Sequence, residues 1–178
     1  METREALRPF AAAPGLLAPQ GGTTDNKAWA EHMFQGATEL ALDAKGRMAV
    51  PTRHRDALTC GGGVVLTAHP DGCLLLYPLL AWEPIGSRLQ ALSHFNEQTR
   101  WWQRLLVGFA EELELDSAGR ILISPALRKF ARLDRQAMLI GQGSHFEVWD
   151  SAGWEEKLTG ALATTGSSPP PGAENFTL

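Results

Sequence analysis

Hydrophobic and polar positions alternate with a period of two on both sides of a short turn in the first third of the chain. Leu40 and Leu42 precede the turn, and Met48 and Val50 follow it, each pair separated by one small residue. This alternation is typical of strands with one buried face. The uninterrupted apolar runs that come next, VVL and LLLY, predict two short buried strands.

The same pattern occurs twice. Residues 39–58 read ELALDAKGRMAVPTRHRDAL, and residues 112–131 read ELELDSAGRILISPALRKFA, an offset of 73. VVLTA and CLLLYPLLAWE then follow in the first copy, and AMLIG and HFEVWDSAGWE in the second, where the offset falls to 72. We infer a duplicated unit with the order strand, turn, strand, short helix, strand, strand.

One such unit, of about 45 residues, buries little surface alone, so the two copies are expected to share one core about a pseudo-two-fold axis. The sequence therefore predicts a β-rich α+β fold. Its units occupy 37–80 and 109–152, and a helical connector spans 81–108. Residues 153–178 are expected to hold the end of a C-terminal helix and a disordered tail. Residues 1–32 are interpreted as a disordered extension, with Met33 as a hypothetical true start of translation.

Turn and cap residues mark the ends of these elements. An Asp at the start of each turn and a Gly three positions later favour a type I turn closed by a left-handed glycine. These residues are Asp43 and Gly46, and Asp116 and Gly119. Ser124 before Pro125 predicts a helix N-cap and first turn, and Asn96 is expected to cap a second connector helix.

Overall charge gives a mixed signal about partners. The formal net charge of −4 argues mildly against nucleic-acid binding. Basic residues nevertheless gather on the repeated segments: 43–56 holds four against two Asp, and 116–135 holds five against two acids. No apolar run reaches the ~18 residues of a membrane span, and the N-terminal residues make a poor secretory signal.

The pattern favours no enzyme and no metal site. Cys60 and Cys73 are interpreted as reduced thiols; a metal site that recruits His69, and His54 with it, would lack the usual paired ligand spacing. No His or Cys nucleophile lies near the turn in both copies, and no phosphate-binding loop of the G-x-x-x-x-G-K-[ST] kind is present. No catalytic residue, cofactor, metal or small-molecule substrate is predicted.

The repeated D-x-x-G-R motif is the candidate site. In one interpretation, the Asp caps the turn and pairs with the Arg. In the other, Arg47 and Arg120 meet an external anion, since a two-stranded ribbon fits the DNA major groove and Arg binds guanine or phosphate. Further DNA contacts are expected from Lys45, Arg55 and Arg128. For the weaker candidates a solvated helix face is the alternative: Arg53, His54, Lys129 and Arg132.

Taken together, these residues resemble a known family. LDAKGRMAVPTRHRDAL and LDSAGRILISPALRKFA are similar to the swapped-hairpin unit of AbrB-like bacterial regulators and antitoxins. The two tandem copies, MFQGATELALDAKGR, RWWQRLLVGFAEELELD and FEVWD together resemble the MraZ family over about residues 33–155. The departures are Trp101-Trp102, where a more basic stretch is expected, and Ser124 at the position of Pro51.

The resemblance implies two AbrB-like swapped-hairpin units in a cytoplasmic, nucleoid-associated transcriptional repressor. It also implies binding to direct repeats in the promoter upstream of the division and cell wall gene cluster, and assembly into a ring-shaped homo-oligomer. An antitoxin-like protein-binding module is the alternative function. It would need a tail that folds on a toxin, and the Pro-rich tail lacks an amphipathic pattern.

Overall fold

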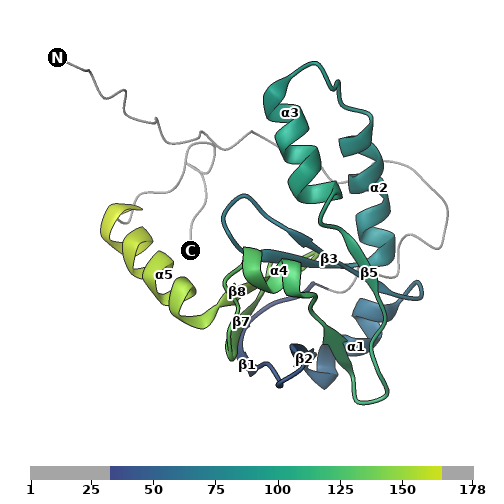
Figure 1. Cartoon of the computed structure of the whole chain (residues 1–178). Coiled ribbons are helices and arrows are strands. Elements are labelled where there is room, and N and C mark those ends of the chain that lie inside the picture. Colours follow the sequence, from purple (N-terminus) through teal and green to yellow (C-terminus); the bar gives the residue numbers. More distant parts are fainter. Residues whose placement is uncertain (1–32, 166–178) are drawn as a thin grey trace, which may run out of the picture.

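The computed structural model describes residues 33–165, and the predictions for 1–32 and for the tail after 165 lie outside this range. The first copy contains β1 (Ala37–Ala41), β2 (Arg47–Ala49), α1 (Thr52–Thr59), β3 (Val64–Ala68) and β4 (Leu74–Pro78). The second contains β5 (Glu111–Leu113), β6 (Arg120–Leu122), α4 (Pro125–Phe130), β7 (Gln136–Gly141) and β8 (Phe146–Asp150). The predicted order of elements in each copy is confirmed (Figure 1).

The strands of the two copies are interleaved. The larger sheet has the order β1-β7-β8-β4-β3-β5, with antiparallel pairing throughout, and β2 pairs with β6 in a second, two-stranded sheet. Each copy's first strand thus pairs with the third strand of the other copy. The two strands on either side of each turn belong to different sheets. In the first copy they stay joined by the bridge between Leu42 and Met48.

The pairing scheme is unchanged when the two copies are exchanged: β1–β7 becomes β5–β3, whereas β4–β8 and β2–β6 map onto themselves. This is the relation expected of a pseudo-two-fold axis, and the strand-rich α+β class is as predicted. Membership of the swapped-hairpin class and the domain boundaries remain predictions.

One hydrophobic core joins the copies, as the small size of the unit required. It includes Met48 and Val50 from the first copy and Ile121 and Ile123 from the second, all with no exposed side-chain surface. Since these residues alternate with outward-facing ones, the period-two pattern of the sequence specifies which face of β2 and β6 is buried.

The predicted helix caps are present. The Ser124 hydroxyl accepts a hydrogen bond from the Leu127 backbone N–H (3.4 Å), and Pro125 occupies the first helical position of α4. Asn96 accepts from the backbone N–H groups of Gln98 and Thr99 at the start of the second connector helix. α1 begins after Pro51, which makes no side-chain cap.

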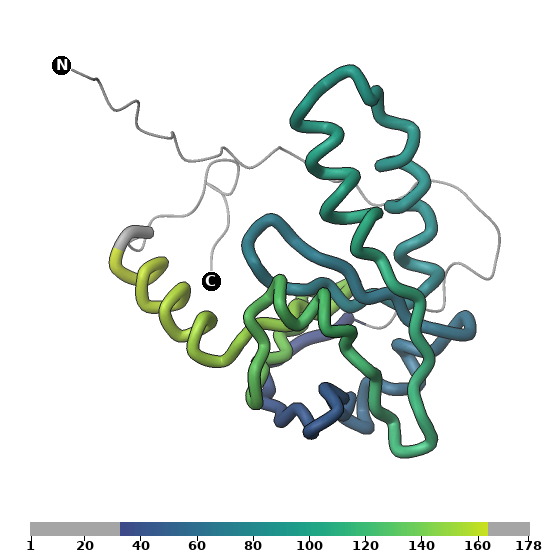
Figure 2. The backbone as a smooth tube through the Cα atoms, viewed as in Figure 1, coloured from purple at the N-terminus to yellow at the C-terminus, as the bar shows by residue number. Residues whose placement is uncertain are grey.

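The connector forms a helical hairpin that stands away from the strands (Figure 2). It consists of α2 (Leu79–Gln90), α3 (Glu97–Trp102) and the π-helical turn η2 (Gln103–Val107). Its base covers the outer face of β3 and β4, where Trp82 is buried in a second apolar cluster. The buried Thr67 hydroxyl donates to the Leu106 carbonyl (2.8 Å), which ties η2 to β3.

The last described element is the helix α5 (Ser151–Thr165). The Asp150 carboxylate accepts from the Gly153 backbone N–H (3.0 Å), and Trp154 packs on Trp149 with ring centroids 5.6 Å apart. Within residues 33–165, no helix combines the length and the apolar character that crossing a membrane requires.

Candidate nucleic-acid interface

The first turn is built by Asp43 and Gly46. Asp43 Oδ1 accepts hydrogen bonds from the backbone N–H groups of Lys45 (2.9 Å) and Arg47 (3.0 Å). The Gly46 N–H donates to the Asp43 carbonyl (2.8 Å), and Gly46 adopts φ +82°, a conformation that costs glycine little. The Asp43 carboxylate therefore serves as the hydrogen-bond acceptor for these two backbone N–H groups of the turn.

The second turn repeats these contacts. Asp116 Oδ1 accepts from the backbone N–H groups of Ala118 and Arg120, both at 2.9 Å. Gly119 donates to the Asp116 carbonyl (2.8 Å) and has φ +72°. Equal sequence spacing has produced equal geometry.

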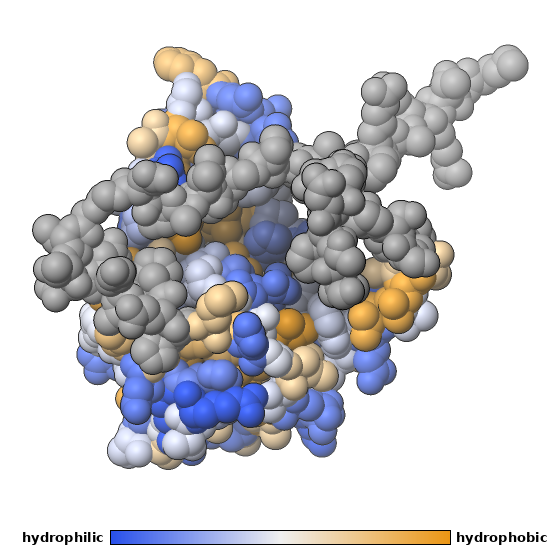
Figure 3. Space-filling model, turned by 180° about the vertical axis from the view of Figure 1, so that it is seen from behind, coloured by the Kyte–Doolittle hydropathy of each residue, from blue (hydrophilic) through white to orange (hydrophobic). Residues whose placement is uncertain are grey.

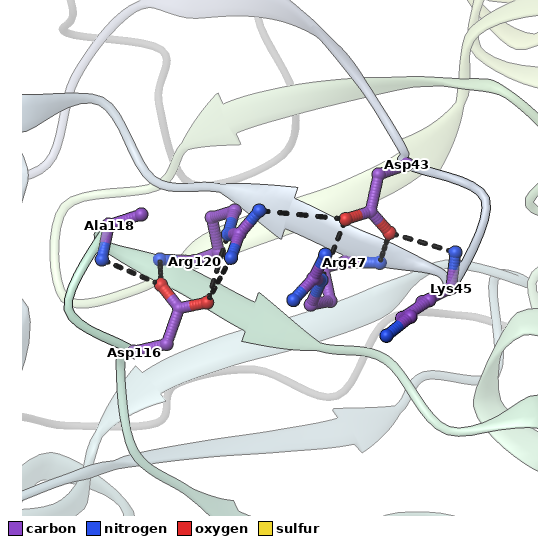
Figure 4. Close-up of polar contacts among 6 residues, drawn as sticks. All are labelled: Asp43, Lys45, Arg47, Asp116, Ala118 and Arg120. Carbon is purple, nitrogen blue, oxygen red and sulfur yellow. Dashed lines mark hydrogen bonds and ion pairs between the residues drawn. The ribbon is translucent and has the colours of Figure 1, made fainter.

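Each turn carboxylate also holds its arginine. Arg47 Nε donates to Asp43 Oδ2 at 2.6 Å, and Arg120 donates through Nε (2.9 Å) and an Nη (2.8 Å) to Asp116 Oδ2. The other Nη of Arg120 reaches across to Asp43 Oδ2 at 3.7 Å. Figure 4 shows this arrangement, in which the two turns are linked by one cross-copy ion pair.

These contacts keep the carboxylates ionised. The hydrogen bond from the Arg47 backbone N–H, and to a lesser extent those from the Arg47 side chain and the Lys45 backbone N–H, lower the pKa of Asp43 to about 2. The hydrogen bond from the Arg120 side chain lowers the pKa of Asp116, and the same bond raises the pKa of Arg120. At neutral pH the site thus contains paired charges of both signs.

The arginines lie on the outward face of the two-stranded ribbon. In the β2–β6 register Arg47 faces Leu122, and Ala49 faces Arg120. Directly opposed residues project from the same side of a sheet, so these four side chains share one face while Met48 and Ile121 fill the other. About a third of each arginine side chain is exposed, and Leu122 is 53% exposed.

Leu122 and Ala49, which share the outward face of the ribbon with the two arginines, carry no motif signal in the sequence. The alternation R-I-L-I already placed Leu122 outward, on the side of Arg120. What the sequence could not indicate was that Leu122 lies opposite Arg47, because this neighbour belongs to the other copy.

Arg55 and Arg128 lie where the two copies cross. Arg55 Nε donates to the Val50 carbonyl (2.8 Å), and Arg128 Nε donates to the Ile123 carbonyl (3.1 Å). Each guanidinium also covers the turn glycine of the opposite copy. A Cβ added to Gly46 would lie 2.6 Å from Arg128 Nε, and one added to Gly119 would overlap the Arg55 guanidinium.

Backbone hydrogen bonds follow the same crossing. The Ile123 N–H donates to the Gly46 carbonyl (3.0 Å), and the Val50 N–H donates to the Gly119 carbonyl (2.9 Å). The structure therefore gives Arg55 and Arg128 contacts within the fold, beside the ribbon rather than on its outward face.

The remaining basic candidates are more dispersed. Lys45 is exposed at the tip of the first turn, and Lys129 and Arg132 are exposed on or just after α4. Arg53 donates to His54 Nε2 (2.9 Å), and the His54 ring packs near Phe34 and Phe146.

Metal ligation finds no support in the part of the chain that the structure describes. No group of three or more His, Cys, Asp or Glu side chains there is arranged to hold an ion. Cys60 is half-buried, Cys73 is buried, and both are free thiols.

Comparison with known proteins agrees with the repeated architecture. The family model of the MraZ protein, whose description includes the term antitoxin-like, matches residues 33–105 and again 106–165. The protein named transcriptional regulator MraZ from Methylobacillus flagellatus is 56% identical over 148 residues, which cover 82% of this chain and all of that protein. Those from Aromatoleum aromaticum and Azoarcus sp. are 54% and 53% identical, each over 147 residues and their whole length. The chain belongs to the MraZ family.

Proposed function

We propose that this protein is a transcriptional regulator that binds double-stranded DNA through the outward face of the β2–β6 ribbon. The observation that carries the proposal is the placement of Arg47 and Arg120, one from each copy, on that single face. The name of its relatives, transcriptional regulator MraZ, supports the same class of function.

The chemistry of the ribbon suits a DNA groove. A two-stranded ribbon is narrow enough for the major groove, where arginine can bond guanine or grip phosphate. The turn carboxylates engage Nε of both arginines and so orient the rest of each guanidinium. The exposed Lys45 adds a phosphate contact, whereas Arg55 and Arg128 support the ribbon from the side.

The family resemblance supplies the finer part of the proposal. The target is a set of direct repeats in the promoter of the division and cell wall gene cluster, which the protein represses together with its own gene in the cytoplasmic nucleoid. A ring-shaped homo-oligomer would bind successive repeats and gain avidity from effective concentration.

Self-association is supported by exposed apolar side chains remote from the ribbon. Around the tip of the connector hairpin, three apolar side chains are exposed: Leu92 (47%), Phe95 (98%) and Trp101 (55%). On α5, two more are exposed: Leu158 (43%) and Leu162 (74%). Figure 3 shows apolar surface at both places. Contiguous exposed apolar surface commonly marks a protein interface.

A titration of fluorescent promoter DNA tests the function. The double variant Arg47→Ala/Arg120→Ala should lose specific binding while keeping the wild-type thermal unfolding profile within a few degrees. Arg88→Ala is the matched control, since it removes an exposed arginine of α2, in the connector. Wild-type affinity should fall steeply with salt because phosphate contact releases counterions. Unchanged affinity of the double variant would refute the proposal.

A further inference from the structure

Because the strands of the two copies are interleaved, the surface around the β2–β6 ribbon consists of two halves, and each half combines segments from both copies. Arg128 of α4 covers Gly46, Ile123 donates to the Gly46 carbonyl, and Leu42 donates to the Arg135 carbonyl (2.8 Å). The first turn therefore lies against the helix and the following loop of the second copy. We call residues 37–50 together with 124–135 the Arg47 half.

The opposite half is assembled in the same way. Arg55 of α1 covers Gly119, and Val50 donates to the Gly119 carbonyl, so the second turn lies against the helix of the first copy. We call residues 110–123 together with 51–62 the Arg120 half. Both halves contain equivalent segments of the duplicated unit, and their charges can be compared directly.

The two halves differ in the sign of their charge. The Arg47 half has a formal charge of +3, from Lys45, Arg47, Arg128, Lys129, Arg132 and Arg135 against Glu39, Asp43 and Asp134. The Arg120 half has a formal charge of −2, from Arg53, Arg55 and Arg120 against Asp56, Glu111, Glu112, Glu114 and Asp116. It stays negative without Glu111, whose carboxylate accepts the Ser124 hydroxyl at the border of the halves.

The turns themselves differ in the same direction. The first turn has an exposed Lys45 where the second has Ala118. Asp43 and Asp116 both lie within ion-pair distance of Arg120, whereas the structure pairs Arg47 with Asp43 alone among the described residues. Arg120 is thus the more neutralised and the more constrained of the two arginines.

We infer that the two halves have different roles: the Arg47 half takes the DNA phosphates, and Arg120 chiefly holds the two turns together. The inference rests on the proposed DNA-binding function and adds a polarity to it. A polyanion is attracted to the +3 half and repelled by the acidic strand β5 of the other. Each subunit would then bind the duplex with its Arg47 half closer to the phosphates than its Arg120 half.

A lysine transfer tests this polarity at constant net charge. The double variant Lys45→Ala/Ala118→Lys moves one basic side chain from the first turn to the second. Both positions are exposed, and the hydrogen bonds that Lys45 and Ala118 make to the turn carboxylates come from the backbone, so the turns should persist. Binding to duplex from the protein's own upstream DNA is measured across a salt series, with thermal unfolding as the folding control.

The expected result is affinity weaker by at least about threefold and a log–log salt slope smaller in magnitude by about one, as for one lost phosphate contact. Unchanged affinity would overturn the inference, since only total charge would then matter. A second pair of variants tests the inference without the lysine transfer. Arg47→Ala should lose more DNA affinity than Arg120→Ala, and the reverse order would equally overturn the inference. Failure of the wild-type protein to bind any duplex would instead refute the proposed function.

Discussion

The two copies agree on the inner face of the larger sheet and differ on its outer face. Leu66 and its counterpart Leu139 are both buried in the shared core. On the outer face, Leu75 of the first copy corresponds to Glu147 of the second. Every residue of β3 and β4 is buried, whereas β7 and β8 are only partly so.

The difference follows from what covers each copy. The connector helices pack on the outer face of β3 and β4, and Leu106 and Trp82 belong to the cluster that contains Leu75. On the outer face of β7 and β8, Trp154 and Lys157 of α5 pack against Trp149. The two copies thus share the residues that form the interleaved core. The residues on the outer face of each copy differ according to the helices that pack on that face.

Core substitutions should show the largest effects and separate the two faces. Leu66→Ala and Leu139→Ala should each lower the free energy of unfolding by about 2–5 kcal/mol, because both leave a cavity in the same core. On the outer face, Leu75→Ala should fall in this range too, whereas Glu147→Ala should cost less than about 1 kcal/mol. Urea unfolding measures all four, and equal losses at 75 and 147 would contradict the comparison.

The turn glycines offer a test of the crossing that both copies share. Gly46→Ala and Gly119→Ala should each cost about 1–3 kcal/mol, from positive φ and from displacement of the arginine above. Gly72→Ala is the control: it has φ +89° but nothing within 4 Å of the added Cβ. If Gly72→Ala destabilises the protein as much as Gly119→Ala, the packed arginines contribute nothing.

Acid should destabilise the protein in two pH windows, and we expect these effects to be smaller than those of the core and glycine substitutions. The folded pKa of Asp43 is lowered from 3.8 to about 2, so its contribution is complete above pH ~4 and is lost as pH falls toward 2. His145, which stacks on Tyr77, has its pKa lowered by burial from 6.5 to about 4. The unfolded chain binds that proton more readily, so stability falls as pH drops from about 6.5 to 4.

Variants assign each window. Asp43→Asn should shrink the lower window, to which Asp116 also contributes, and His145→Phe, which keeps an aromatic ring beside Tyr77, should shrink the upper one. His145 occupies the position of Cys73 in the first copy, and His54 of the first copy, whose pKa burial also lowers, contributes to the same upper window. Chemical denaturation at a series of pH values measures both, and an upper window that His145→Phe leaves unchanged would contradict this assignment.

Local sequence was enough to predict the elements and their caps. Asp43 and Asp116 are followed by a glycine at the position that a left-handed turn needs, and Ser124 and Asn96 cap helices as their neighbours indicated. Such signals act over a few residues, and they can be read without knowing what the segment packs against.

The exchange of strand partners is not encoded in this way. The alternation around Met48 specifies a buried face but not whether β2 pairs with its neighbour β1 or with β6, since both would bury the same residues. For the same reason the sequence could not show that the guanidinium groups of Arg55 and Arg128 lie over the turn glycines of the opposite copy, and their DNA contacts stay a prediction. The uneven charge of the two halves became visible only once segments 73 residues apart were placed side by side.

A nuclease footprint of the full chain on its own upstream DNA tests the central claim, that the paired copies present one arginine-bearing ribbon to DNA. We expect a periodic series of protected repeats, retained by Arg88→Ala and lost with Arg47→Ala/Arg120→Ala. Protection that survives in the folded double variant, or no protection by the folded wild-type protein at any concentration, would contradict it.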